Sequence, residues 1–424
     1  MSTDRNRNGW IQPFVWLAVP FALVCLPLLL SSRVTNYTWD ETSYHLPAVR
    51  QIHAHWPKLD LLRDSLSATA PGYHYFLATI SQVTGTSLLA LRLINFLVSA
   101  GVLALLCHAW PVGRPQATAI FAIMPLAFSN FFVKSAAYLV TDNAALLTIT
   151  ATLLALFFMP SPLGLRRSSL WSALSVFIRQ SGLWLVAPLA GRILSEPNKT
   201  RRLYFIFPPC LILGWLVLTW GGVVPPVWRS TTHATQGVVP AAGAYIFSVL
   251  ALFAPAYYIA IQFREWREDI ASRWTVAGAI IGLGLASAGS NAPDYEAGRW
   301  GGYLWNLAAT MPSVRGFSFV FLVLSPIGGA WLGMLVLRLW RETTAAVAGA
   351  WLVAFSAWVG SALVNRQLFQ RYYEPTLLVM LICWLMLIIR KRPVAFTPMI
   401  KPLALLSGAQ LAITLLTAYL RTFG

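Results

Sequence analysis

Charged residues are scarce in this chain of 424 residues. They make up 11% of the sequence, whereas hydrophobic residues make up 57%, and soluble domains carry about a quarter charged residues. Only 14 residues are acidic, against 31 Lys and Arg, so the formal net charge is +17. So few charged side chains cannot cover a surface that faces water on all sides. The composition therefore predicts an integral membrane protein.

Motifs for metals, nucleotides and disulfides are also missing from the sequence. The cysteines lie singly in apolar stretches, without a Cys-x-x-Cys pair or a histidine at metal-ligand spacing. There is no Gly-rich phosphate loop and no short repeat, so an ATP-driven pump or a nucleotide-sugar enzyme has no visible nucleotide site. We therefore expect no metal site and no cofactor. The four cysteines are Cys25, Cys107, Cys210 and Cys383.

Long apolar stretches are what the sequence has instead. They recur from 13–30 to 403–420, and each is long enough to cross a hydrocarbon core of roughly 30 Å as a helix. We count about eleven to thirteen crossings. The predicted fold is therefore all-α, a polytopic transmembrane helical bundle that forms a single domain over residues 1–424. An aromatic, acidic segment follows the first stretch in place of a cleavage site, so we expect a retained anchor.

The basic residues punctuate the apolar stretches rather than forming a stripe, so the positive charge does not indicate nucleic-acid binding. If the N-terminus is cytoplasmic, the basic clusters can all lie on that side, as the positive-inside rule requires. We therefore expect a multi-pass protein of the bacterial inner membrane or the endoplasmic reticulum, with its chemistry on the non-cytoplasmic face. The clusters are Arg5/Arg7, Arg166/Arg167, Arg192/Lys199/Arg201/Arg202, Arg264/Arg267/Arg273, Arg338/Arg341 and Arg390/Lys391/Arg392/Lys401.

The first external loop, residues 32–87, is long enough to fold. It carries Trp39-Asp40-Glu41, an amphipathic stretch at 45–56 and a breaker at 70–72. Amphipathic segments next to membrane spans are typical of interfacial helices that lie on the membrane surface. We expect this first loop to hold the catalytic acids.

Carboxylates on the external side are the first candidates for chemistry. Asp40 and Glu41 follow the first span closely, and Asp142 lies at an external helix start. A carboxylate can take the proton of an acceptor hydroxyl, and an acid at membrane depth is a functional candidate by default. Asp40 is the predicted general base, with Glu41 beside it. The alternative is structural, because both positions can cap helices.

A polar interruption at 179–182 separates two apolar stretches that are each too short to span alone. Such a broken or re-entrant hairpin is tolerated only where protein or a watery cavity covers the backbone. Arg179 within it must meet a carboxylate, a carbonyl or a ligand phosphate. A salt bridge from Arg179 to Asp142 is the structural alternative to phosphate binding.

Cations late in the chain are further candidates for phosphate binding. Arg366 and Arg371 lie at the outer end of a late helix, beside Glu374 and two tyrosines. Arginine binds phosphate through a planar fork, whereas tyrosines also serve as interface anchors. His233 and the polar group at 294–299 lie in external loops, which are polar for ordinary reasons.

Four stretches, in order over about the first 240 residues, carry a family resemblance. They are the first-loop series DE at 40–41, HLP at 45–47 and TAPGY at 69–73, then YLVTD at 138–142, FIRQS at 177–181 and WGGVV at 220–224. They resemble the GT-C superfamily, and within it the eukaryotic endoplasmic-reticulum α-1,2-glucosyltransferases that add the terminal glucose to the lipid-linked oligosaccharide. The chain differs by an extra residue between Glu41 and His45, by Pro225-Pro226 where the family has Gly-Asp, and by Gly298-Arg299-Trp300 in place of Asn-Arg-His-Tyr.

The resemblance implies an inverting, metal-independent glycosyltransferase. It would move a hexose, by analogy glucose, from a polyprenyl-phosphate-linked donor to a glycan or lipid-linked acceptor, with membrane lipids as its surroundings. A first-loop carboxylate would act as base. The residues assigned on this basis are Asp40 and Glu41 for catalysis, Asp142, His45 and Gln180 for orienting acceptor or donor, and Arg179, Arg366, Arg371 and His233 for the lipid phosphate.

Two other functions stay open. A secondary transporter or lipid flippase would also use an intramembrane Arg179 and a broken hairpin, although the sequence shows no two-half symmetry. A related GT-C enzyme could instead use a mannose or pentose donor, because nothing in the sequence selects one hydroxyl pattern. The long acidic and aromatic first loop favours an enzyme. Whether that loop packs over Asp142 and Arg179 separates enzyme from transporter.

Overall fold

The structure is a computed structural model, and it is 81% helical with almost no strands. Among the residues it describes, eight helices are long and apolar enough to cross a membrane, or nine if the bent pair α6 (Gln116–Ala127) and α7 (Asn130–Ala137) is one span. This confirms an all-α polytopic helical bundle. The described residues are 9–32, 36–58, 60, 66–196, 202–229, 237–261, 266–291, 300–365, 367–392 and 396–420.

The number of long apolar helices is below the number of crossings that we expected. Two apolar helices, α8 (Asp142–Phe158) and α15 (Arg273–Ser287), have only 17 and 15 residues. At 1.5 Å per residue, helices of this length reach about 22 to 26 Å, which is short of a hydrocarbon core of roughly 30 Å. These two helices are therefore too short to be counted among the candidate spans.

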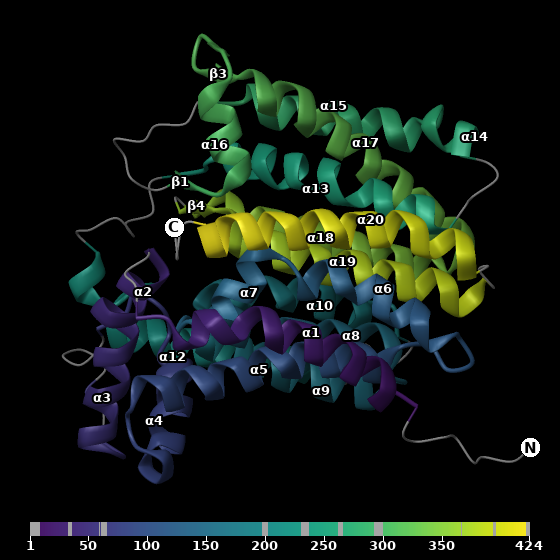
Figure 1. Ribbon diagram of the computed structural model, residues 1–424. Coiled ribbons are helices and arrows are strands. Elements are labelled where there is room, and N and C mark those ends of the chain that lie inside the picture. The colour runs from purple at the N-terminus through teal and green to yellow at the C-terminus, as the bar shows by residue number, and fades with distance from the viewer. Residues whose placement is uncertain are drawn as a thin grey trace, which may run out of the picture. The chain divides into compact units, whose positions relative to one another are not determined.

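The chain divides into two compact units. Unit 1 is Met1–Val186, Thr200–Thr231 and Ser407–Gly424, and unit 2 is Ala187–Lys199 and Thr232–Leu406. Figure 1 labels the elements of both. Unit 1 holds α1 (Ile11–Leu30), α2 (Asn36–Asp40), η1 (Glu41–His45), α3 (Leu46–His55), α4 (Gly72–Thr84), α5 (Leu88–Ala109), α6 to α8, α9 (Leu163–Ile178), η2 (Gln180–Leu185), η3 (Leu203–Ile206), α12 (Phe207–Trp220), η4 (Pro226–Trp228), the end of α20 (Phe396–Thr414) and η5 (Leu415–Leu420).

Helix α8 is the central helix of unit 1. Thirteen of its 17 residues are buried, and a helix that is apolar all round is one that packs on every side. It packs closely against α9, where Ser168 Oγ donates to the Thr152 carbonyl at 3.3 Å and a Cβ on Gly164 would lie 2.7 Å from the Ala155 carbonyl oxygen. Small side chains let two membrane helices approach, so this pair forms a close-packed core for the unit.

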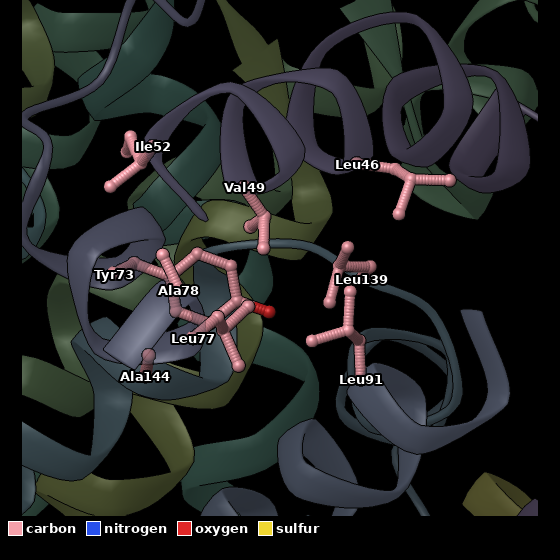
Figure 2. Close-up of a cluster of buried hydrophobic side chains, with 9 residues drawn as sticks. All are labelled: Leu46, Val49, Ile52, Tyr73, Leu77, Ala78, Leu91, Leu139 and Ala144. Carbon is pink, nitrogen blue, oxygen red and sulfur yellow. The ribbon is translucent and has the colours of Figure 1, made fainter. Parts of the chain in front are cut away.

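The first loop of unit 1 folds into short helices, as expected. In Figure 1, α3 and α4 lie at one end of α1 and α5 and run steeply across the direction of those helices. Leu46, Val49 and Ile52 of α3 face α4 across a buried apolar cluster, and Figure 2 shows the Tyr73 ring lying across its middle. Leu91, Leu139, Leu77, Ala78 and Ala144 complete the cluster.

Unit 2 is a second helical bundle. Its helices α15 and α17 (Phe319–Glu342) pack closely against each other, and Gly278 faces Gly329 at their contact. Two short strand pairs lie among the helix ends, β1 with β4 in parallel and β2 with β3 antiparallel. The elements are α10 (Val186–Leu194), α13 (Pro240–Ile261), α14 (Trp266–Ile270), α15, β1 (Trp300–Gly301), α16 (Tyr303–Thr310), β2 (Ser313–Val314), β3 (Phe317–Ser318), α17 (Phe319–Glu342), α18 (Ala345–Leu363), β4 (Leu368–Phe369), α19 (Gln370–Lys391) and the start of α20.

Candidate functional site

The polar stretches of unit 1 gather at one end of its helices, which we call the loop end. The last turns of α1, α9 and α12 lie there with the first turns of α5 and α8, and the first loop packs onto them. These helices alternate in direction along the chain, so their polar termini fall at the same end. All four stretches that carry the family resemblance therefore have residues at the loop end.

Glu41 is fully buried at the loop end in an ion pair with Arg92. Arg92 Nε and Nη2 donate to the two carboxylate oxygens at 2.7 and 2.5 Å, and the Leu139 N–H donates to Oε1 at 2.9 Å. Arg92 Nη1 also donates to the carbonyls of Leu29 and Ser31. A buried ion pair persists when its other hydrogen-bonding groups are satisfied in this way. The Glu41 carboxylate therefore holds the loop to α5, and the catalytic role predicted for Glu41 stays a prediction.

Asp142 and Arg179 form a second ion pair, less buried than the first. Asp142 begins α8 and Arg179 directly follows α9, and Arg179 Nη1 lies 2.8 Å from Asp142 Oδ1. Their side chains are 8% and 20% exposed. The salt bridge named as the structural alternative is therefore present. A guanidinium has five N–H donors in a planar fork, so pairing with one carboxylate is compatible with contact to a phosphate.

Gln180 bonds to the backbone of two loops. Its amide nitrogen donates to the carbonyls of Ala68 at 2.9 Å and Val223 at 3.1 Å, and its oxygen accepts from the Ala70 N–H at 3.0 Å. These three bonds join the first loop, the start of η2 and the loop after α12. The predicted role in orienting a substrate stays a prediction, whereas the structural role of Gln180 is plain from its partners.

The turn before α4 closes tightly on the end of α9. A Cβ on Gly72 would come within 2.6 Å of the Phe177 carbonyl oxygen, so only glycine allows this approach. Ala70 packs with Leu216 and Trp220 of α12. The first loop is thus attached to α9 and α12 as well as to α5.

A stacked histidine pair lies within the first loop. His45 Nδ1 and His74 Nε2 are 2.9 Å apart, with ring centroids 5.2 Å apart. Burial lowers the pKa of His74 to about 4, so this ring is neutral at pH 7. Burial, and then the charges of Glu41 and Asp142, raise the pKa of Tyr73 well above its ordinary value. His45 is itself buried, and its predicted contact with substrate stays untested.

Asp40 differs from the other loop-end carboxylates because it is half-buried rather than enclosed. It ends α2, directly before the π-helical turn η1. Burial, and then the charge of Asp40, raise the pKa of the nearby Tyr44. Of the adjacent acids Asp40 and Glu41, Asp40 is therefore the less buried.

The late cations belong to unit 2 or to undescribed positions. Arg371 lies over the rings of Phe369 and Tyr372, with its guanidinium carbon 5.3 and 5.1 Å from the ring centroids. Glu374 is fully buried, accepts from Gln370 Nε2 at 2.7 Å and bonds to the Tyr303 hydroxyl. Both therefore take part in local networks of unit 2. Arg366, His233 and the group at 294–299 lie outside the described residues.

Two charged networks were not anticipated from the sequence. Arg92 had not been singled out, and neither had Asp269, a fully buried acid held by Arg341 Nη1 at 3.0 Å and by Arg338 and Tyr258. An arginine inside an apolar span must find an anion, so Arg92 in the stretch 88–109 and Arg338 in 319–342 carried a usable signal. That signal predicts a partner without saying which acid it is.

Within the described part of the chain, no group of three or more His, Cys, Asp or Glu residues could hold a metal ion. We compared the chain with protein-family models, curated proteins and solved structures, and none of the three comparisons gave a match.

Proposed function

We propose that the protein is a membrane glycosyltransferase that moves a hexose from a polyprenyl-phosphate-linked donor to a glycan or lipid-linked acceptor. The observation that carries this proposal is the convergence at the loop end. Stretches of sequence as far apart as Asp40 and Val223 resemble one enzyme family in order, and their residues lie at one end of unit 1. A resemblance by chance would not require those stretches to meet.

The chemistry needs one base and one cation. In the proposed reaction the acceptor hydroxyl gives its proton to the Asp40 carboxylate, and its oxygen forms the new bond to the anomeric carbon. The bond from that carbon to the phosphate oxygen breaks, and the lipid phosphate leaves with the electron pair. Arg179 stabilises the charge that develops on the phosphate, as preorganised cations do in other transfers. Asp142 holds the Arg179 guanidinium in place through their ion pair.

An enzyme explains the attached first loop better than a transporter does. The loop is held to α5 through Glu41, to η2 through Gln180 and to α9 through the contact at Gly72. Alternating access requires elements that separate and close again around a site. A loop fixed at three points supports a permanent binding surface beside Asp142 and Arg179.

The charge pattern of unit 1 supports a loop end on the non-cytoplasmic side. Basic residues cluster at the opposite end, where Arg114 follows α5, Arg166 and Arg167 lie in α9, and Arg202 precedes α12. Arg202 Nη1 donates to Ser161 Oγ at 2.6 Å, which joins two of the basic connections. By the positive-inside rule that end faces the cytoplasm.

The test is sugar transfer by purified protein with the Asp40→Asn variant in parallel. Radiolabelled polyprenyl-phosphate glucose, mannose and pentose are offered separately with a total lipid and glycan extract as acceptor. We expect transfer from one donor, and a loss of about a hundredfold or more in Asp40→Asn, as for removal of a general base. Asp60→Asn, an exposed acid of the same loop, is the matched control. Equal transfer by Asp40→Asn and wild type would remove Asp40 as base, and inertness with all donors would reject the glycosyltransferase.

A further inference from the structure

Three aromatic side chains from two distant segments meet at the loop end beside Asp40. The Trp39 and Tyr44 rings are 5.1 Å apart at 89°, and the Tyr44 and Trp228 rings are 5.3 Å apart at 76°. Edge-to-face pairs at these distances are favourable arrangements for aromatic rings. The rings therefore support one another, and we call the three together the aromatic platform.

The backbone explains why these rings meet. Trp39 and Tyr44 are five residues apart, and the π-helical turn over Glu41–His45 brings positions i and i+5 onto one side. Trp228 ends the short helix η4, which begins at Pro226 directly after Pro225. The loop that leads into η4 is held by Gln180 at the Val223 carbonyl. The platform thus depends on the proline pair that departs from the family sequence.

Exposure and charge distinguish the aromatic platform from a packed core. The Trp39 side chain is 53% exposed although it is large and apolar. The carboxylate of Asp40, the next residue, acts on Tyr44 through its charge. The exposed indole packs on Tyr44, and Tyr44 in turn lies within the influence of the Asp40 carboxylate. The three residues together offer an apolar face for the C–H groups of a sugar ring and, nearby, an acceptor for its hydroxyls. A lipid acyl chain would have no use for the carboxylate.

We infer that Trp39, Tyr44 and Trp228 form the site that binds the terminal pyranose ring of the acceptor, with its hydroxyl directed to Asp40. This inference rests on the proposed function, because the base is the same Asp40. It assigns acceptor recognition to the segment in which the chain departs from the family that it resembles, and it commits to a neutral pyranose as ligand.

The experiment measures binding separately from transfer. Full-length protein in lipid nanodiscs is titrated with short oligosaccharides of glucose, of mannose and of galactose, and saturation-transfer NMR detects the bound sugar. We expect one series to bind wild type, Trp39→Ala and Trp228→Ala to bind it about tenfold more weakly, and Trp39→Phe to lose less. Trp56→Ala is the matched control, since Trp56 is also exposed on the first loop but contacts Tyr75 instead.

Each outcome decides the inference. Selective weakening in Trp39→Ala and Trp228→Ala supports the aromatic platform even if no donor is found, in which case only the glycosyltransferase proposal fails. Equal binding of the sugar by these variants and by wild type, or no binding of any series by wild type, would overturn the proposed acceptor site. The glycosyltransferase proposal would then still be tested by the transfer assay. If brominated lipid quenches the fluorescence of Trp39 and the Trp39→Ala variant binds sugar as wild type does, Trp39 is a membrane anchor. That result would also overturn the proposed acceptor site.

Discussion

Glu41 shows how one buried carboxylate can hold together segments that are far apart in sequence. Its two oxygens accept from Arg92 and from the Leu139 N–H, and none of the residue is exposed to solvent. Removing one partner of a buried pair leaves the other charge uncompensated, which costs about 3 to 5 kcal/mol. The position is therefore decisive for folding whatever its part in chemistry.

We predict that Glu41→Ala lowers the free energy of unfolding by about 3 kcal/mol or more. The physical cause is the stranded Arg92 guanidinium, and the double variant Glu41→Leu/Arg92→Met should recover part of the loss. Thermal unfolding followed by size-exclusion chromatography of detergent-solubilised protein provides the measurement. Asp40→Asn is the control and should unfold as wild type. An unchanged melting temperature in Glu41→Ala would contradict the assignment.

Arg179 should affect turnover rather than substrate affinity. Because it is proposed to stabilise the departing phosphate, Arg179→Gln should reduce kcat about a hundredfold with little change in KM for the donor. Asp142→Asn leaves the cation and should reduce kcat less. If both variants lose the same activity, and lose stability in parallel, the pair is structural only.

His74 gives the first loop a dependence on pH. Its pKa is about 4 in the folded protein and near 6.5 when exposed, so the unfolded state binds more protons between these values. The contribution of neutral His74 to the free energy of unfolding is therefore fully present above about pH 6.5. It falls by up to ~1.4 kcal/mol per pH unit as the pH is lowered to about 4. Melting temperatures from pH 7 to pH 4 should fall less steeply in His74→Asn than in wild type. A slope that is unchanged in His74→Asn would contradict this assignment.

At the scale of single residues, the sequence indicates which side chains need partners but not who the partners are. Arg179 in an apolar stretch required an anion, and the salt bridge to Asp142, given as the alternative to phosphate binding, is present. Gln180 resembled a substrate contact, yet its amide is used by Ala68, Ala70 and Val223. Every residue has a backbone carbonyl whatever its type, so no sequence motif could have revealed these bonds.

At the scale of elements, the contact between α15 and α17 depends on glycine. A Cβ on Gly329 would lie 2.0 Å from the Gly278 carbonyl oxygen, and a Cβ on Gly278 would lie 2.0 Å from that of Gly329. The clash is with backbone, which no rotamer change can relieve, and close helix approach in membranes relies on small residues. The two helices would have to separate to admit even a methyl group.

We predict that Gly278→Ala and Gly329→Ala each destabilise the protein by about 1 to 3 kcal/mol or more, as overpacking does. Gly284→Ala is the matched control, because it lies on the same helix and its Cβ would meet nothing within 4 Å. The fraction of protein that remains monodisperse after heating measures the effect. Similar losses from all three variants would show that helix flexibility, rather than the close contact, is responsible.

Element types followed from the sequence more readily than their lengths. Apolar runs predicted nearly all long helices, and a helix in the first loop was expected from the pattern at 45–56. The apolar helices α8 and α15 are shorter than a full span. A run of apolar residues does not say where the helix stops, since a backbone turn such as that before Asp142 is set by tertiary contacts.

At the scale of the whole molecule, the loop end is predicted to face the non-cytoplasmic side of the membrane. The opposite end of unit 1, which carries the basic residues, is predicted to face the cytoplasm. Helix α5 has 22 residues, about 33 Å of helix, and separates exposed Thr84 from exposed Val112. In a Cys210→Ser background the other three cysteines are buried. Thr84→Cys should react with an impermeant maleimide only from the non-cytoplasmic side, and Val112→Cys only from the cytoplasmic side. Reaction of both from one side would exclude α5 as a span.

The ion pair between Glu41 and Arg92 also sets an order for biosynthesis. The two residues are 51 positions apart, and at about 5 to 20 residues per second the ribosome needs roughly 3 to 10 s to add the second after the first. During that interval the nascent first loop lacks the arginine that later fixes it. The loop can therefore close only once α5 has entered the bilayer, so lateral release of this helix from the insertion machinery times the assembly of the site.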